Sequence, residues 1–392
     1  MQLLRVCSGG SFDYDKDLIE SLSKSVIDVN AFIGSLNSPG KRYYIRVNVL
    51  KISPGELYDR LRGYGLKVFF DEVLEEALWF PVEGPYNVKD VGRYVFVDKR
   101  TAESVFVGAN VYAPGVVKAK GIRRGDIVNV VGPKGIIVAE GEAVVNGEEM
   151  EKMKKGLAIR VYKSCYRLPK LRELDEYAYG YFYEQSFPAI LTTHVLDPKP
   201  GDIVIDMCAA PGGKTSHIVE YTSGKARVLA FDHSKSKIKR LQETLARLGH
   251  DGLVEVFKAD SRYLDIDFPW IKADKVLLDP PCTSLGVRPK IYDEKKYIDV
   301  VNNARYQRQF IKVAYKILKP GGILVYSTCT VTLEENEENI AYAEKIGFKV
   351  IEVERIVGSN GKGKHYFNDM VLRFYPHIHD VTGYFIAKLI KI

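Results

Sequence analysis

The chain has 392 residues, of which 46% are hydrophobic and 27% charged, and its formal net charge is +7. This ordinary globular composition excludes a disordered tail and a disulfide-stapled miniature, and the length predicts two or three domains. Because no apolar run reaches the roughly 18 to 20 residues of a membrane helix and the first residues do not form a signal peptide, we expect a cytoplasmic protein with no membrane segment.

Residues 1–91 predict a small α+β segment. Helical apolar spacing covers residues 15–33, alternation typical of a strand covers 43–50, and a second helix and strand are predicted at 56–64 and 66–70. We expect this segment to pack beside a larger domain.

Residues 92–166 consist of short β-rich runs separated by glycines, among them GDIVNVVG and GLAIRVY. Short strands with frequent turn signals predict a small closed or half-closed barrel. Residues 152–172, which run from its last part into the connector, contain eight basic residues and no acidic one, so this stretch carries +8 against +7 for the whole chain. Such a stretch indicates polyanion binding, although a solvated helix and linker face is the alternative that charge alone leaves open.

Residues 167–392 begin with a tyrosine-rich connector and then alternate strands and helices. Strands are predicted at 203–207, 227–232, 253–258, 275–279 and 323–327, with helices between them, for example at 234–248 and 302–318. This order predicts a Rossmann-like, doubly wound α/β sheet. Since such sheets bind ligands beyond the carboxyl ends of their strands, candidate site residues are sought there.

The first of these strands runs into CAAPGGKTSH, a glycine-rich turn that opens a helix. Gly212 and Gly213 allow the backbone to approach a ligand closely. The P-loop spacing GxxxxGK[ST] is absent, because Cys208 stands five residues before Gly213. We therefore expect an adenosine cofactor without phosphates, while a plain packing turn remains the alternative.

Two aspartates follow the next strands. Asp232 stands about 20 residues after the glycine turn, which suits hydrogen bonds to ribose hydroxyls. Asp260 is placed to meet an adenine amino group. Either aspartate alone could instead cap a helix, but together with the turn they favour a cofactor crevice.

Five cysteines occur, namely Cys7, Cys165, Cys208, Cys282 and Cys329, and no two of them form a CxxC pair. An odd number without such pairs argues against a disulfide framework and a structural zinc site. We therefore expect that a cysteine important for function acts as a single thiol.

Cys282 and Cys329 follow the fourth and fifth strands, the former in Asp279-Pro-Pro-Cys. Neighbouring parallel strands share one crevice, so these thiols can converge. A thiolate that adds to C6 of a pyrimidine makes C5 nucleophilic enough to take a methyl group from a sulfonium, while a carboxyl group at N3 neutralises the ring. The residues alone do not rank the two thiols, and a lone strand-end cysteine is more often a small buried hydrophobe.

Five segments resemble the NSUN, or Nop2/Sun, family of RNA 5-methylcytosine methyltransferases: RVNVLK (46–51), DMCAAPGGKT (206–215), DPPC (279–282), STCT (327–330) and RFYPHIHDVTGYFIAKL (373–389). In addition, GANVYAPGV, GDIVNVVG and GLAIRVY resemble a PUA domain, an RNA-binding barrel. A PUA module before the catalytic core is similar to the branch that methylates a tRNA cytosine at the acceptor end, nucleotide position 72. The resemblance covers most of the chain and implies S-adenosylmethionine as cofactor and tRNA as partner.

Carried over position by position, the resemblance makes Cys329 the nucleophile and Cys282 the thiol that assists product release. It implies that Asp279 contacts the base and the methionine end of the cofactor, and that Lys214 stabilises the carboxylates of the site; a solvated lysine at a helix start is the alternative for Lys214. The cofactor-binding residues it implies are Cys208, Ala209, Ala210, Pro211, Gly212, Gly213, Lys214, Asp232, Lys237, Asp260 and Asp279.

Expected RNA contacts are Tyr112, Lys118, Lys134, Lys154, Lys155 and Arg160, since backbone phosphates are bound by basic residues. His377 and His379 alternate along an expected strand without a third ligand nearby, so we expect packing or hydrogen bonding and no metal site. We expect a monomer. An rRNA cytosine-C5 methyltransferase, an RNA-binding assembly factor with an inactive core, and methylation of a base amino group are the alternatives.

Overall fold

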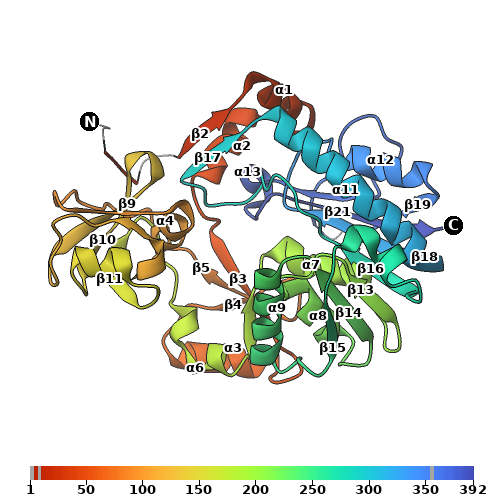
Figure 1. Ribbon diagram of the computed structural model, residues 1–392, viewed down its shortest axis with the longest axis horizontal. Coiled ribbons are helices and arrows are strands. Elements are labelled where there is room, and N and C mark those ends of the chain that lie inside the picture. Colours follow the sequence, from red (N-terminus) through yellow and green to blue (C-terminus); the bar gives the residue numbers. More distant parts are fainter. Residues whose placement is uncertain (1–3, 8–9, 354–356) are drawn as a thin grey trace.

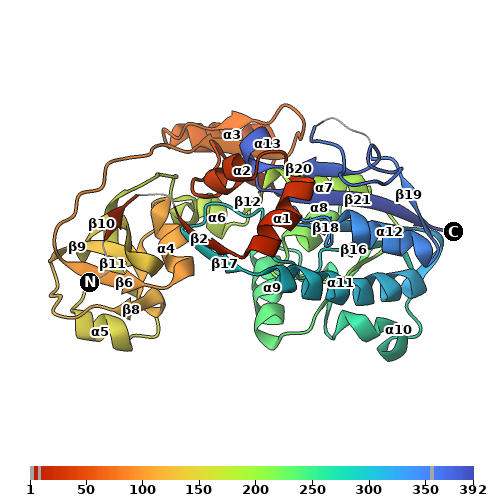
Figure 2. The ribbon, with the colours of Figure 1, turned by 90° about the horizontal axis from the view of Figure 1, so that it is seen from above.

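The computed structural model describes residues 4–7, 10–353 and 357–392. A β-barrel lies at one end of the molecule and a large α/β sheet at the other, with N-terminal elements between them (Figure 1 and Figure 2). Among the residues described, no helix is both long and apolar enough to cross a membrane.

The α/β part is built on an eight-stranded sheet of order β15-β14-β13-β16-β18-β21-β19, with β20 paired to β21. The parallel strands are β13 (Ile203–Asp206), β14 (Arg227–Asp232), β15 (Val254–Lys258), β16 (Ala273–Leu278) and β18 (Leu318–Thr328). β21 (Tyr384–Lys391) runs antiparallel to β18, β19 (Phe348–Ile351) and β20 (Leu372–Phe374). The doubly wound sheet is confirmed, and β18 begins five residues before its predicted start.

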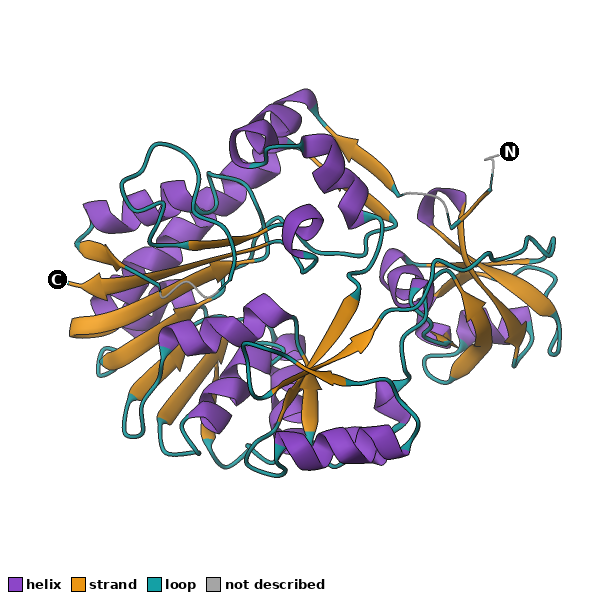
Figure 3. Cartoon of the chain, turned by 180° about the vertical axis from the view of Figure 1, so that it is seen from behind, coloured by secondary structure: helices purple, strands orange, loops and turns teal. Residues whose placement is uncertain are grey.

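Helices cover both faces of this sheet (Figure 3). Side chains alternate along each strand, so Ile205 packs with α11 (Tyr297–Ile317) and α12 (Glu337–Lys345), whereas Val204 faces the other side. There it packs with α7 (Phe187–Leu196), α8 (Gly213–Tyr221) and α9 (Lys235–Leu248). The strand order reverses between β13 and β16, and this switch point opens a crevice at the carboxyl ends.

Three strands of the N-terminal segment and one strand of the connector, β12, form a four-stranded sheet of order β12-β3-β5-β4. Its strands are β3 (Arg42–Val47), β4 (Phe69–Phe70), β5 (Ala77–Pro81) and β12 (Phe182–Glu184), with α3 (Pro54–Gly63) beside them. β2 (Ser11–Tyr14) pairs separately with β17 (Tyr292–Lys295).

The single helix predicted over residues 15–33 is wrong. The structure has α1 (Lys16–Ser25) and α2 (Val29–Leu36) instead. Each helix has its own N-cap, because Asp15 accepts from Leu18 N and Asp28 from Ala31 N. An aspartate cap inside an apolar periodic run therefore marks a new start that periodicity alone does not show.

The predicted small barrel is confirmed as a sheet of order β7-β11-β10-β9-β6-β8, to which β1 adds a strand at β10. The strands are β1 (Arg5–Val6), β6 (Tyr94–Val97), β7 (Val111–Tyr112), β8 (Val116–Lys118), β9 (Ile127–Gly132), β10 (Ile136–Ala143) and β11 (Leu157–Ser164). Helices α4 (Lys99–Phe106) and α5 (Gly147–Lys152) close it around a core rich in valine and isoleucine.

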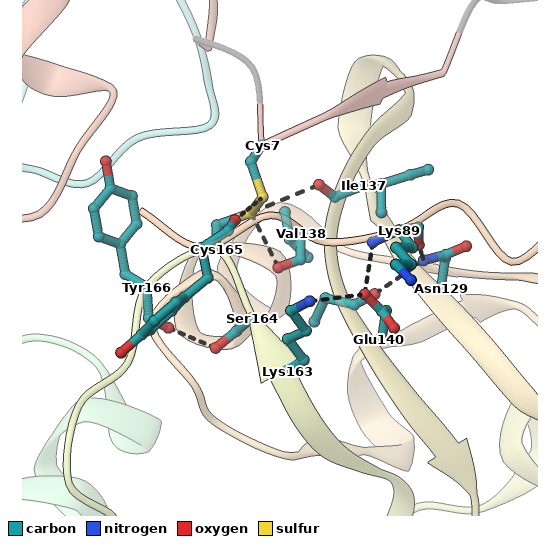
Figure 4. Close-up of a disulfide and its surroundings, with 12 residues drawn as sticks. Cys7, Lys89, Asn129, Ile137, Val138, Glu140, Lys163, Ser164, Cys165 and Tyr166 are labelled. Atoms are coloured by element: carbon teal, nitrogen blue, oxygen red, sulfur yellow. Dashed lines mark hydrogen bonds and ion pairs between the residues drawn. A yellow bond between two sulfur atoms is a disulfide. The ribbon is translucent and has the colours of Figure 1, made fainter. Parts of the chain in front are cut away.

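Cys7 and Cys165 form a disulfide (Figure 4), a pair that the argument against a disulfide framework missed. They are 158 positions apart in sequence, with Cα atoms 5.6 Å apart. They meet because β1 and β11 both lie against β10, and Cys7 N donates to the Ile137 carbonyl. The spacing of the cysteines along the sequence does not predict such a pair. Cys208, Cys282 and Cys329 are free thiols.

Candidate active site

A cavity of about 230 Å³ opens at the carboxyl ends of the central parallel strands. Eight of the site residues predicted from the sequence line this cavity: Cys208, Ala210, Asp232, Lys237, Asp260, Asp279, Cys282 and Cys329. Ala209, Pro211, Gly212, Gly213 and Lys214 belong to the adjoining turn and the start of α8, outside the lining of the cavity. The carboxylates and both thiols are thus brought to one crevice.

The glycine-rich turn is organised by Asp206, the last residue of β13. Its buried carboxylate accepts from Thr215 Oγ1 at 2.7 Å and from Cys208 N at 3.3 Å. Burial raises the pKa of Asp206 to about 6. Gly212 has a φ of 109°, and a Cβ at Gly213 would lie 2.6 Å from the Tyr183 ring. Both glycines are therefore needed for this turn.

Arg46, in β3, contacts the start of α8. The sequence did not predict a role for this residue. Its Nε lies 2.7 Å from Glu220 Oε2, and its Nη1 and Nη2 donate to the Gly213 carbonyl and to Ser216 Oγ. Arg46 is fully buried, so these bonds hold the glycine-rich turn against the N-terminal sheet. Arg46 is the first residue of the motif RVNVLK, which carries part of the family resemblance. The sequence around it does not indicate that Glu220 is its partner.

Asp232 and Asp260 present carboxylates at the ends of β14 and β15. Asp232 is 4% exposed, and Lys237 Nζ lies 3.6 Å from its Oδ2. Asp260 accepts from Arg262 N, and hydrogen bonds from the Arg262 guanidinium lower the pKa of Asp260. Asp260 therefore caps the short 3-10 helix Ser261–Tyr263 and also lines the cavity.

Asp279 follows β16 and forms an ion pair with Lys214 Nζ from the first turn of α8. Ser327 Oγ donates to Asp279 Oδ1 at 3.4 Å, and the Tyr384 hydroxyl donates to Ser327. Although burial alone would lower it, the ion pair with Asp279 holds the pKa of Lys214 well above its usual value. Lys214 is thus a buried, charged partner of Asp279 rather than a solvated lysine.

Cys282 and Cys329 converge as the strand order predicts, with Sγ atoms 3.4 Å apart. The hydrogen bond between the two sulfurs lowers the pKa of Cys329 and raises that of Cys282. The directions of these shifts favour ionisation of Cys329, and at 3.4 Å either sulfur can donate to the other. Residue types alone could not supply this ranking.

The loop that carries Cys282 is held by a buried polar network that sequence reasoning missed. Glu335 accepts from Thr283 N at 2.9 Å and from Thr283 Oγ1 at 2.6 Å. Gln307 Nε2 donates to Glu335 Oε1 and to the Pro281 carbonyl. Glu335 stands in an acidic run, TLEENEEN, which resembles an ordinary helix start. Its contacts depend on tertiary packing.

A second cluster lies outside the cavity lining. Glu76 Oε1 lies 2.6 Å from His194 Nε2 and 3.1 Å from His217 Nε2, close enough for a shared metal ion. Among the described residues, however, buried His217 Nδ1 has no hydrogen-bond partner. A metal on Nε2 would place a proton on this orphaned nitrogen, where metal-bound histidines normally have an acceptor. Hydrogen bonds to Glu76 account better for the cluster.

His377 and His379 lie in the short helix α13 (Pro376–His379), so the expected strand at this point is wrong. Pro376 suits the first turn of a helix. The expected hydrogen bonding and packing are confirmed: His379 Nδ1 accepts from Tyr375 N at 2.9 Å, and the His377 ring packs edge-on to Phe32.

Burial lowers the pKa of His217 to about 3 and of His250 to about 4. Unfolded histidines take up protons near pH 6.5, while these remain neutral in the fold. Between pH 6.5 and 4 we therefore expect the free energy of unfolding to fall by ~1.4 kcal/mol per pH unit for each histidine. Urea denaturation from pH 7.5 to 4.5 measures this slope. His217→Gln is expected to remove the contribution of one histidine to this slope. Replacing the exposed His233 with Gln is expected to leave the slope unchanged.

The expected RNA contacts come from several elements of the barrel. Tyr112 is 55% exposed and borders a groove of about 670 Å³ between α4, β7 and residues 168–173. Lys134, between β9 and β10, lies over the Tyr292 ring. Lys118, Lys154, Lys155 and Arg160 are exposed on or beside β8, α5 and β11.

The basic stretch 152–172 is partly neutralised by acidic residues from elsewhere in the chain. Lys163, Lys170 and Arg172 form ion pairs with Glu140, Glu173 and Glu184, respectively. Its effective charge is therefore smaller than the +8 counted along the sequence.

Comparisons with known proteins match nearly the whole chain. A family model described as 16S rRNA methyltransferase RsmB/F matches residues 193–390, and a PUA domain model matches residues 93–164. The tRNA (cytosine(72)-C(5))-methyltransferase of Pyrococcus horikoshii is 44% identical over 93% of each chain. NSUN6 of Homo sapiens, described by the same activity, is 30% identical over 84% of this chain and 78% of its own.

Among solved structures, the crystal structure of NSun6 from Pyrococcus horikoshii with SFG superposes with a TM-score of 0.88 at 44% identity. The match covers 96% of this chain and 98% of the other.

Proposed function

The chain belongs to the methyltransferase family described as 16S rRNA methyltransferase RsmB/F, and on this premise we propose that it transfers a methyl group from S-adenosylmethionine to C5 of cytosine 72 in tRNA. The observation that carries the proposal is the pair of free thiols, 3.4 Å apart, in a crevice lined by Asp232, Asp260 and Asp279. The PUA match and the two relatives that match 93% and 84% of this chain favour the tRNA acceptor end over rRNA.

The residues of the crevice fit S-adenosylmethionine. The almost buried Asp232 suits ribose hydroxyls, Asp260 suits the adenine amine, and the glycine turn allows close backbone approach. The Lys214–Asp279 pair offers both charges needed by the amino acid end. When bound, the cofactor supplies an electrophilic methyl group on its sulfonium. The structure solved with the cofactor analogue SFG belongs to a relative of the same fold.

In the proposed mechanism, the Cys329 thiolate forms a bond to C6 of the cytosine, which makes C5 nucleophilic. Asp279 accepts from the exocyclic amine of the base, and it passes to N3 the proton that it takes up when the Cys329 thiol ionises. After C5 has gained the methyl group, its proton passes to water or to Cys282, which must first have lost its own proton to solvent in order to act as the base. The bond between C6 and Cys329 Sγ then breaks, which restores the aromatic ring and the thiolate.

We propose that residues 1–91, 92–166 and 167–392 divide the work: the last part holds the catalytic site, the middle part binds RNA, and the first part packs on the catalytic core. One tRNA would contact the groove beside Tyr112 and place its acceptor end in the crevice. We further propose that the protein acts as a monomer in the cytoplasm.

Bisulfite sequencing of total tRNA and rRNA, after incubation with enzyme and cofactor, tests the function. We expect protection from conversion at tRNA position 72. Protection in rRNA instead would support the rRNA alternative, and no 5-methylcytosine despite normal cofactor binding would indicate an inactive core. Mass spectrometry of the nucleosides separates C5 methylation from methylation of the amino group.

Some members of the basic stretch have no ion pair among the described residues, and they give a prediction for RNA affinity. Replacing Lys154, Lys155 and Arg160 with glutamine is expected to weaken tRNA binding ~10- to 50-fold near 0.1 M salt and to reduce the slope of log K against log salt by about 2. Cofactor affinity is expected to stay the same. Filter binding over a salt series and calorimetry measure the two quantities.

The matched control removes the same charge at or near α12 and β19, which lie at the opposite end of the molecule from the barrel (Figure 1), through Lys345→Gln, Lys349→Gln and Lys364→Gln. Equal loss of tRNA binding in both triple variants would show that overall charge, and not this surface, sets the affinity. Loss of cofactor binding in the first variant would indicate misfolding.

A further inference from the structure

Ser284 stands on the loop after Cys282 in a conformation that is unusual for its type. Its φ is 57°, in the left-handed region that glycine adopts freely and residues with a side chain disfavour. The loop is fixed here, because Gly286 N donates to the Cys329 carbonyl and Val287 N donates to the Ser284 carbonyl. Such strain, when maintained at a site, points to a functional role.

The strained backbone directs the Ser284 hydroxyl towards the two thiols. Ser284 Oγ lies 3.4 Å from Cys329 Sγ and 3.8 Å from Cys282 Sγ, and the residue lines the cavity. Within the described part of the chain, these sulfurs are the partners found for the hydroxyl. A glycine at this position would adopt the same backbone without strain, but it would offer no hydroxyl.

Ser284 Oγ accepts from the Cys329 thiol in the structure. We propose that Ser284 is a positioning residue: once this thiol has lost its proton, the Ser284 hydroxyl turns to donate a hydrogen bond to the Cys329 thiolate and thereby selects this sulfur over Cys282 as nucleophile. A thiolate accepts from an O–H donor more strongly than a thiol does, so the bond favours the ionised form of Cys329. The proposal deepens the proposed function and rests on it for its part in catalysis.

Other groups face Cys329 as well, and their charges largely cancel. Asp279 opposes ionisation of the thiol and Lys214 favours it, but the two form an ion pair with each other. Lys290 is buried nearby and is paired with Asp293. Hydrogen bonds involving the neutral groups Cys282 and Ser284 therefore have the larger effect on which sulfur ionises.

The test follows the rate of iodoacetamide alkylation against pH, with the modified cysteine identified by peptide mass spectrometry. In Ser284→Ala and Ser284→Gly we expect the apparent pKa of Cys329 to rise by about 0.5 to 1 pH unit, which lowers its alkylation rate at pH 7 ~3- to 10-fold. The maximal methylation rate is expected to fall by a similar factor, with little change in KM for tRNA.

Ser223 provides a matched control, because it is an exposed serine with a φ of 53° beyond the end of α8. Ser223→Gly relieves the same backbone strain and Ser223→Ala keeps it, in both cases without touching a thiol, and we expect unchanged alkylation. If both Ser284 variants alkylate Cys329 like the wild type and differ only in melting temperature, the residue is merely structural and the proposal is wrong. A shifted alkylation profile in an enzyme that methylates no RNA would sustain the hydrogen bond and overturn the proposed function.

Discussion

Replacing Cys329 with alanine is expected to lower methyl transfer to tRNA by ~10³-fold or more, since no covalent bond to C6 can then form. Cys282 lies only 3.4 Å away but does not substitute, because its hydrogen bond to Cys329 and its burial raise its pKa. Transfer of labelled methyl groups from the cofactor to tRNA measures the loss.

Calorimetric binding of S-adenosylmethionine is the control, and Cys329→Ala is expected to leave this affinity unchanged. Retained turnover in Cys329→Ala, together with loss of turnover in Cys282→Ala, would exchange the roles of the two thiols. The matched variant Cys208→Ala, which changes the third free thiol of the cavity wall, is expected to keep most of the activity.

The strands of the α/β sheet could be predicted because each is a short apolar run bounded by glycine or aspartate. The predicted range 227–232 is the range of β14 itself. Helix boundaries near the N-terminus could not be predicted, because the capping of α2 by Asp28 interrupts an otherwise continuous periodicity. A local hydrogen bond there overrides the pattern over the whole segment.

The approach of the two thiols could also be predicted, since parallel strands bring their carboxyl ends to one edge. The network behind them could not. Glu335 and Arg46 contact the site across 52 and 167 positions of sequence, through Thr283 and the Gly213 carbonyl. The Cys7–Cys165 disulfide spans 158 positions. Such partners become neighbours only through the packing of whole elements.

These buried partners give the thiols a fixed geometry. Glu335 holds the segment before Ser284 through Thr283, and Arg373 holds the segment after Cys329 through the Val331 carbonyl. Arg373 and Glu337 form an ion pair that is fully buried. Removing one member would leave an uncompensated charge in the interior. The spacing of the two sulfurs is therefore maintained by groups that touch neither of them.

Cys282→Ala is expected to trap the RNA on the protein. The Cys329 thiolate remains able to add to C6, but the methylated base then lacks the thiol that assists removal of the C5 proton. Turnover is expected to fall ~100-fold or more, while a covalent complex accumulates. Gel electrophoresis under denaturing conditions should show a slower band that contains both tRNA and labelled methyl groups.

The loss of Cys282 also removes a hydrogen bond to Cys329, which raises the pKa of Cys329 and slows its attack. Because the later step is slowed more, the complex still accumulates, and raising the pH is expected to speed its formation. Cys282→Ser, which keeps a weaker proton-transfer group, should form less of it. The double variant Cys282→Ala/Cys329→Ala is expected to form none, and a band in this variant would show that another residue binds the RNA.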